Sequence, residues 1–247
     1  MTGQPVALIT GASRGIGAAT ARELARRGYA LVLAARSAGP LAALAGELRA
    51  AAGATLPIAT DIRSADDRRA LAERALQEFG RVDALILNAG IGGAGAVARM
   101  PEDAAAATIE TNLLAPIELA RLLLPQMLAR RSGAIVLIGS VVGHIGVPGS
   151  SVYSASKFGL RGFADGLRRE VARQGIAVTL VSPGFVRTAI TADMRFPMPG
   201  PELVARAVAR ALVRPRRELI VPGYYRPLAW IAQALPWLAD AALRERR

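Results

Sequence analysis

Short, continuous apolar runs alternate along this chain with longer stretches in which apolar residues recur every three or four positions. The short runs are typical of strands that are buried on both faces of a parallel sheet, and the longer stretches are typical of helices that cover such a sheet. The short runs predict strands at Val6–Thr10, Leu31–Ala35, Leu56–Ala59, Val82–Leu87, Ala134–Ile138, Ala177–Val181 and Arg217–Val221.

The stretches between these runs predict the helices. The first helix is expected to follow a glycine-rich turn and to end near Arg27, where Gly28 provides a C-terminal stop. Ser64 is the expected N-cap of a helix that ends at Phe79. The other helices are expected at about Pro40–Ala52, Glu102–Thr111, Leu113–Arg131 and Ser154–Gln174. Strands that alternate with helices pair in parallel through right-handed crossovers. The pattern therefore predicts an α/β fold, a single Rossmann-type doubly wound parallel sheet of about seven strands flanked by helices.

The pattern changes after residue 223. In residues 224–247, apolar side chains recur at helical spacing, with tryptophans beside them and arginines at the end: Leu228, Trp230, Ile231, Leu235, Trp237, Leu238, Arg244, Arg246 and Arg247. We expect residues 1–223 to form the Rossmann-type domain and 224–247 to be an amphipathic helical segment of that same domain, kinked at Pro236. Such a helix could pack against a partner subunit, which we favour, lie on an anionic membrane, or cover a lipophilic substrate as a lid.

Composition narrows the function classes. The chain has 247 residues, which suits one α/β domain, and no cysteine, which excludes disulfides and thiolate metal ligands. With a single histidine, His144, no metal site is expected. Lysine and arginine outnumber the acidic residues by 31 to 19, a net charge of +12, but aromatic residues are only 4% and do not accompany the scattered arginines. We therefore expect solvated basic helix faces and no nucleic-acid partner.

No secretory signal is expected from the first residues, and the sequence has no long uncharged apolar stretch. Together with the missing cysteines, this favours a cytoplasmic protein, with peripheral contact to the inner face of a membrane through residues 224–247 as the alternative location.

A glycine-rich turn, Thr10–Gly17, connects the first predicted strand directly to the first helix. Glycines let the backbone approach a pyrophosphate, and the start of a helix offers free N–H groups and a partial positive charge. A strand, a turn of this kind and a helix together predict a dinucleotide site. The residues expected to bind the dinucleotide here are Gly11, Ser13, Arg14, Gly15, Ile16 and Gly17.

The end of the second strand indicates which dinucleotide binds. In NAD-binding sheets of this type an acidic residue at that place holds the ribose 2′-hydroxyl. This chain has Ala35 there, followed by Arg36, and Arg14 lies in the glycine turn. An arginine can pair bidentately with a 2′-phosphate, so we expect NADP(H) as the cofactor.

Three polar residues follow in an order that suggests catalysis. Ser140 ends the fifth strand, and Tyr153 and Lys157 lie four residues apart at the start of a long helix, so they share one helix face. With the dinucleotide turn, this set resembles the short-chain dehydrogenase/reductase family over about residues 5–190. The motifs that carry the resemblance are Thr10–Gly17, Asp61, Asn88-Ala89-Gly90, Asn112, Ser140, Tyr153-x-x-x-Lys157 and Pro183-Gly184 with Thr188.

The resemblance implies catalytic roles. Tyr153 would be the general acid in reduction and the base in oxidation, with its pKa lowered by Lys157 and the positive nicotinamide ring. Lys157 would also hold the nicotinamide ribose. Ser140 would hydrogen-bond the substrate oxygen, and Asn112 would fix a water that connects Lys157 to solvent.

The resemblance implies cofactor contacts as well. Asp61 and Ile62 would meet the adenine, and Asn88, Ala89 and Gly90 would lie along the adenine ribose. The nicotinamide carboxamide would meet Pro183, Gly184, Val186 and Thr188. One departure is Leu87, where many family members carry a second asparagine. Members often pair through the helices that correspond to Leu113–Arg131 and Ser154–Gln174, so a homodimer or homotetramer is expected.

The substrate is expected to depend on residues 92–97, 141–149 and 189–201, which lie beside these motifs. The last stretch contains Met194, Phe196 and Met198 among prolines and is expected to form a lid. We expect reduction of a lipophilic ketone or aldehyde to its alcohol. The alternatives are a β-ketoacyl reductase acting on acyl chains and a non-catalytic NADP(H)-binding sensor. His144 could touch substrate, but a plain loop histidine is the favoured interpretation.

Overall fold

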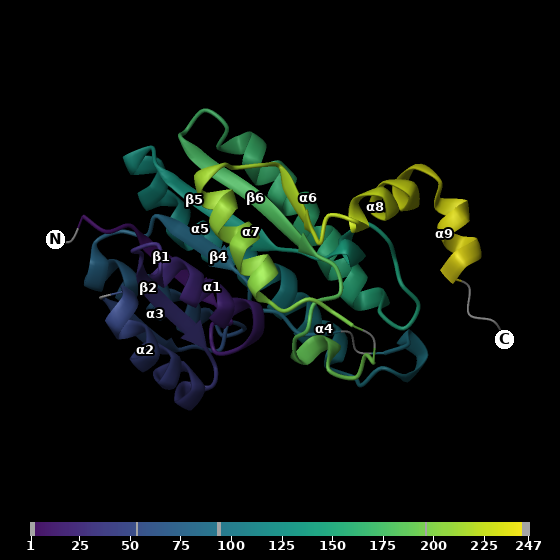
Figure 1. Cartoon of the computed structure of the whole chain (residues 1–247), viewed down its shortest axis with the longest axis horizontal. Helices are drawn as coiled ribbons and strands as arrows, with labels where there is room; N and C mark the ends of the chain where they lie inside the picture. The colour runs from purple at the N-terminus through teal and green to yellow at the C-terminus, as the bar shows by residue number, and fades with distance from the viewer. Residues whose placement is uncertain (1–2, 53, 93–94, 196, 244–247) are drawn as a thin grey trace.

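The predicted parallel sheet forms in the computed structural model, which describes residues 3–52, 54–92, 95–195 and 197–243 (Figure 1). The strands in these ranges are β1 (Val6–Thr10), β2 (Ala30–Ala35), β3 (Thr55–Ala59), β4 (Ala84–Leu87), β5 (Gly133–Ile138), β6 (Ile176–Pro183) and β7 (Glu218–Val221). They make one seven-stranded sheet, ordered β3-β2-β1-β4-β5-β6-β7, and every pair is parallel. The order reverses between β1 and β4, and an open α/β sheet has its ligand crevice at the carboxyl side of such a point.

Helices cover both faces of the sheet (Figure 1). The helices that flank it are α1 (Gly15–Ala25), α2 (Ala38–Ala52), α3 (Ala65–Phe79), α4 (Ala104–Ile109), α5 (Ala115–Arg130), α6 (Ser151–Glu170) and α7 (Glu202–Val213). Successive strand residues point to opposite faces. Val6 and Leu8 on β1 therefore join the core beneath α3, α5 and α6, while Ala7 and Ile9 join the core beneath α1, α2 and α7. The doubly wound architecture is confirmed.

The helix boundaries differ from the prediction in two places that matter for the site. The break expected near Asn112 is instead a π-helical turn, Glu110–Leu114, which joins α4 to α5 without interruption. A π turn accommodates one extra residue within a continuous helix. The polar residues at this place therefore do not end the helix. Helix α6 begins at Ser151, three residues before the predicted Ser154, and this places Tyr153 inside its first turn.

Helix α7 was not predicted from the sequence. It provides the crossover between β6 and β7, and its small residues pack against α1. Its buried positions are mostly alanines: Val204, Ala205, Ala207, Val208, Ala209 and Ala211. Valine and alanine recur there every three or four positions, so the sequence carries a helical pattern that the prediction missed.

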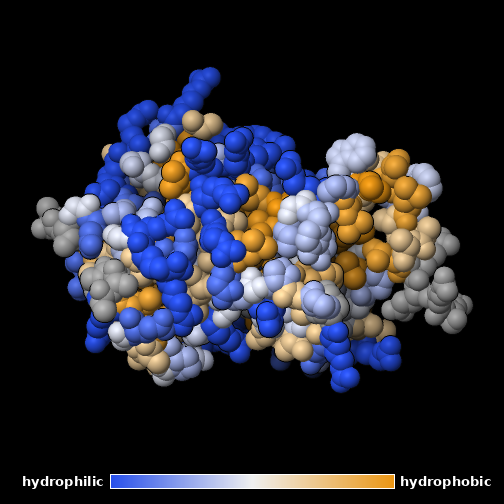
Figure 2. All heavy atoms as spheres, in the orientation of Figure 1, coloured by the Kyte–Doolittle hydropathy of each residue, from blue (hydrophilic) through white to orange (hydrophobic). Residues whose placement is uncertain are grey.

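The C-terminal segment is two short helices, α8 (Tyr225–Ala234) and α9 (Pro236–Leu243), where a single kinked helix was expected. The residue between them, Leu235, is non-helical because the ring of the following proline disfavours the helical conformation there. We call α8 and α9 the C-terminal arm. The arm extends from the body of the molecule, and orange apolar side chains lie along it (Figures 1 and 2).

The C-terminal arm leaves much of its apolar surface exposed. Trp230 is 68% exposed and Trp237 is 63% exposed, and Leu228 is also exposed. Among the described residues, none of the helices is long and apolar enough to cross a bilayer. Contact with a partner subunit, a membrane surface or the substrate stays a prediction for this segment, and Arg244, Arg246 and Arg247 lie outside the described residues.

The expected N-cap at Ser64 is confirmed, and it yields a stability prediction. The Ser64 hydroxyl accepts a hydrogen bond from the Asp67 N–H at 3.1 Å, and the Asp67 carboxylate accepts one from the Asp61 N–H at 2.7 Å. Ser64→Ala should lower the free energy of unfolding by about 1 kcal/mol in urea titrations, because a backbone donor loses its partner. The control is Ser132→Ala at an exposed serine. An equal loss of unfolding free energy in both variants would show that the Ser64 cap does not contribute to stability.

Candidate active site

A cleft of about 610 Å³ lies where β1 to β6 end at their carboxyl side. All of the predicted cofactor and catalytic residues line this cleft except two, Gly17 and Asn112. The predicted residues that line it are Gly11, Ser13, Arg14, Gly15, Ile16, Arg36, Asp61, Ile62, Asn88, Ala89, Gly90, Ser140, Tyr153, Lys157, Pro183, Gly184, Val186 and Thr188. Residues from many separate points of the chain therefore converge on one volume.

The glycine turn needs residues without side chains. Gly11 and Gly15 have φ values of +65° and +56°, a region that favours glycine. Gly17 does not line the cleft, but a Cβ there would lie 2.7 Å from Asn88 Nδ2. The missing side chain lets α1 approach the turn closely, so that the N-terminus of α1 faces the cleft. This cradle of backbone N–H groups fits a pyrophosphate.

Asn88 fastens the loop after β4 to the glycine turn. Its Nδ2 donates to the Thr10 carbonyl at 2.8 Å and to the Gly11 carbonyl at 3.3 Å. The backbone N–H groups of Asn88 and Ala89 both donate to Thr10 Oγ1 at 3.0 Å. The two loops on either side of the point where the strand order reverses are thus held together by hydrogen bonds.

One end of the cleft is basic. Arg14, Arg36 and Arg63 line it together with Asp61. Arg63 pairs with Asp61 at 3.1 Å, and hydrogen bonds from Arg63, with the nearby charge of Arg36, lower the pKa of the Asp61 carboxyl below its ordinary value. Sequence reasoning missed Arg63. The available signal was its position two residues after Asp61, next to the same strand end as the expected adenine contacts.

The other end of the cleft holds the three residues expected to be catalytic. Ser140, Tyr153 and Lys157 line one stretch of its wall, and Ser140 forms a hydrogen bond with the Tyr153 phenol. Lys157 is 5% exposed, and its Nζ donates to the Ile138 carbonyl at 2.9 Å. The same Nζ lies 5.7 Å from the centre of the Tyr153 ring. The hydroxyl and the phenol can therefore reach one substrate oxygen, with the ammonium held near the phenol ring.

Burial moves the pKa values of the phenol and the ammonium in opposite directions. Burial raises the pKa of Tyr153 above its ordinary value, and the hydrogen bond with Ser140 opposes this rise. Burial lowers the pKa of Lys157 from 10.5 to about 8. Both shifts follow from the cost of a charge away from water. At neutral pH the protein groups alone hold a protonated phenol beside a charged lysine.

Asn112 lies beneath the cleft and not on its wall. It is 0% exposed, and its amide brackets the Ile91 backbone: Oδ1 accepts from the N–H at 2.9 Å and Nδ2 donates to the carbonyl at 3.0 Å. Gly90, just before, leaves so little room that a Cβ would lie 3.2 Å from Asn112 Oδ1. Asn112 therefore shapes the loop beside Lys157, and its expected link to a water stays a prediction.

Apolar side chains line the cleft beside the Ser140 end. They are Ile91, Val141, Val142, Val147, Phe185, Ile190 and Met194. Met194 and Ile190 belong to the predicted lid segment, whereas Phe196 lies outside the described residues. His144 is buried and is not among the residues that line the cleft.

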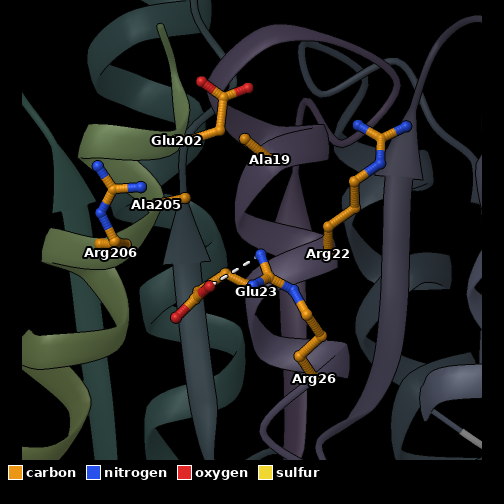
Figure 3. A pocket seen from close by; sticks show the side chains of 7 residues that line it. All are labelled: Ala19, Arg22, Glu23, Arg26, Glu202, Ala205 and Arg206. Carbon is orange, nitrogen blue, oxygen red and sulfur yellow. Dashed lines mark ion pairs between the residues drawn. The ribbon is translucent and has the colours of Figure 1, made fainter.

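A second, smaller hollow of about 130 Å³ lies between α1 and α7 (Figure 3). Arginines and glutamates surround it, among them Arg22, Glu23 and Arg26. These charges already pair: Arg26 with Glu23 at 3.0 Å, and Arg22 with Glu47 at 2.7 Å. None of the residues predicted to be functional lines this hollow.

Comparison with known proteins finds similar reductases and dehydrogenases. The chain is 41% identical over 228 residues to the ketoacyl reductase HetN of Nostoc sp., covering 90% of this chain and 79% of that protein. A short-chain dehydrogenase from Sphingobium yanoikuyae, solved with NADPH, has a TM-score of 0.85 at 33% identity and 98% coverage of both chains. A short-chain dehydrogenase/reductase from Burkholderia phymatum, solved with NAD, has a TM-score of 0.87 at 27% identity, covering 96% of this chain and 95% of that one.

The family model of the short chain dehydrogenases matches residues 5–197, most of the chain and nearly the range over which the motifs occur. The protein belongs to the short-chain dehydrogenase/reductase family and is an NAD(P)-dependent oxidoreductase.

Proposed function

We propose that this protein transfers a hydride between NADP(H) and a carbonyl or alcohol carbon, and that it reduces a lipophilic ketone or aldehyde. The observation that carries the proposal is the meeting of Ser140, Tyr153 and Lys157 at one end of a cleft whose other parts fit a dinucleotide. Each of the three residue types has a defined task in hydride transfer to a carbonyl, and the cleft brings them within reach of one oxygen atom.

The residues present fit NADP(H) in two respects. The glycine cradle and the N-terminus of α1 would receive the pyrophosphate. Arg14, Arg36 and Arg63 would meet the 2′-phosphate, since arginines pair strongly with phosphate. Asp61 lies among them, but its carboxylate is already paired with Arg63. The preference for NADP(H) over NAD(H) does not follow from family membership, because related structures hold either NADPH or NAD.

The chain's own groups would handle the proton. When bound, NADPH supplies the hydride to the carbonyl carbon. The Tyr153 phenol would donate its proton to the carbonyl oxygen, which becomes the hydroxyl of the product, while the Ser140 hydroxyl donates a hydrogen bond to that oxygen. Lys157 would favour the phenolate that remains, because its ammonium is held near the ring by the Ile138 carbonyl.

The apolar wall supports a lipophilic substrate. Val141, Val142, Ile190 and Met194 would contact the substituents of the carbonyl, and methionine adapts well to varied apolar shapes. The alternative substrate is a β-ketoacyl chain, which the similarity to a protein named ketoacyl reductase favours. A net charge of +12 would suit an acidic carrier of such a chain. A non-catalytic NADP(H) sensor is the remaining alternative.

Activity measurements test the proposal. NADPH oxidation at the cofactor's own absorbance, measured over a panel of lipophilic ketones, aldehydes and β-ketoacyl thioesters, should show turnover. Tyr153→Phe should reduce kcat/KM by about 100-fold or more, because the proton donor is lost while NADPH still binds. Tyr29→Phe, at a tyrosine outside the cleft, is the matched control. NADPH binding without turnover of any carbonyl would contradict the reductase and favour the sensor.

Cofactor preference has a separate test. Arg36→Asp should raise the KM for NADPH roughly ten-fold or more and shift the preference toward NADH, because a carboxylate repels the 2′-phosphate. Arg49→Asp makes the same charge change at an exposed position of α2 and should leave the ratio of the two KM values unchanged. A ratio that moves equally in both variants would show a general effect of net charge.

A further inference from the structure

A polar network behind the active-site wall connects four parts of the fold. Its centre is His144, which follows the Ser140 turn and is 5% exposed. His144 Nε2 lies 2.7 Å from Glu218 Oε1 on β7. The same carboxylate oxygen accepts a hydrogen bond from Ser182 Oγ on β6 at 2.5 Å, and Arg161 on α6 lies 3.9 Å from the other oxygen.

The C-terminal arm joins this network through Gln233 on α8. Although Gln233 is an exposed residue, its Nε2 lies 2.5 Å from His144 Nδ1. Arg161 Nη2 donates to Gln233 Oε1 at 3.2 Å. Because an arginine only donates, Oε1 must face Arg161, and the amide N–H₂ must then donate to His144 Nδ1. The histidine therefore carries its proton on Nε2 and donates it to Glu218.

This arrangement leaves every partner satisfied. Burial acts to raise the pKa of Glu218, but the hydrogen bonds from His144 and Ser182 and the charge of Arg161 hold it below its ordinary value. The carboxylate thus accepts hydrogen bonds from two sides, and the imidazole links it to the arm. Connected hydrogen bonds of this kind hold their members in one geometry.

The other end of α8 rests on the opposite wall of the cleft. Tyr225 packs over Gly184, where an added Cβ would lie 2.8 Å from Tyr225 Cζ. Its ring also meets Phe185 edge-on, with ring centres 6.3 Å apart. Helix α8 therefore spans from the Pro183–Phe185 wall at its first residue to the Ser140–His144 turn near its last.

The Ser140–His144 turn is short and closely packed. The Gly143 N–H donates to the Ser140 carbonyl at 2.9 Å, and the His144 N–H donates to the Val141 carbonyl at 3.0 Å. A Cβ on Gly143 would lie 2.9 Å from the Lys157 carbonyl. A displacement of His144 would therefore move the turn that carries Ser140.

We propose that His144 and Gln233 are positioning residues: together they tie the C-terminal arm to the turn that carries Ser140 and so set where Ser140 meets the substrate oxygen. Neither residue lines the cleft, and both act through the turn. The kinetic part of this inference rests on the proposed reductase function, whereas its structural part does not.

The test compares Gln233→Leu with the wild-type protein in two measurements. Amide hydrogen exchange should become about ten-fold faster at Val142, Gly143 and His144, because the arm no longer holds the turn. With the best substrate of the carbonyl panel, kcat/KM should fall roughly ten-fold, while the NADPH dissociation constant stays within about two-fold. Gln77→Leu, at an exposed glutamine of α3 outside the network, is the matched control and should change neither quantity.

A double variant tests whether the two residues act as one unit. If they do, the double variant with His144→Phe and Gln233→Leu should have the same kcat/KM as the single variant His144→Phe. Lower thermal stability with unchanged exchange in the turn and unchanged kcat/KM would show a structural role only and overturn the proposal. If the wild-type protein reduces no carbonyl, the proposed function fails. Amide exchange at Val142, Gly143 and His144 then still decides whether the C-terminal arm holds the Ser140–His144 turn.

Discussion

The ammonium group of Lys157 is the feature around which the site is built. Folding removes it almost wholly from water and gives it a neutral carbonyl, that of Ile138, as its protein partner. Such a burial disfavours the charge, and the pKa of Lys157 falls to about 8 as a result. The lysine remains charged at neutral pH, and further negative charge nearby would stabilise that charge. A phenolate at Tyr153 would supply that charge, so the two groups depend on each other.

The parallel sheet makes this burial feasible. Each strand ends on the same side, so the residues that follow β1, β4, β5 and β6 surround the lysine and the cofactor cleft from several directions. Asn88 fixes the loop after β4 to the glycine turn, and Asn112 fixes the next loop segment at Ile91. These amides satisfy backbone groups that would otherwise be unpaired beside the cleft. The chemistry thus stands on loops that hydrogen bonds make rigid.

Much of the fold and the cleft could be predicted from the sequence, because strands buried on both faces give continuous apolar runs and because Gly11, Tyr153 and Lys157 belong to motifs of fixed spacing. Other features depend on contacts between distant segments. The packing of α7 against α1 is one of them. The extra residue of the π turn at Glu110–Leu114 is a local feature that the apolar pattern does not indicate either. His144 and Gln233 are 89 residues apart, and no local pattern pairs them.

In the proposed reaction, the positive nicotinamide ring of bound NADP⁺ should join Lys157 beside Tyr153 and make its phenolate easier to form. The protein alone holds the pKa of Tyr153 above its ordinary value. The direct measurement is an NMR titration of protein labelled with ¹³C at the ζ carbon of its four tyrosines, with Tyr153→Phe to assign the signal, in the absence and presence of NADP⁺. We predict that NADP⁺ lowers the pKa of Tyr153. A pKa that stays unchanged or rises when NADP⁺ binds would contradict this account.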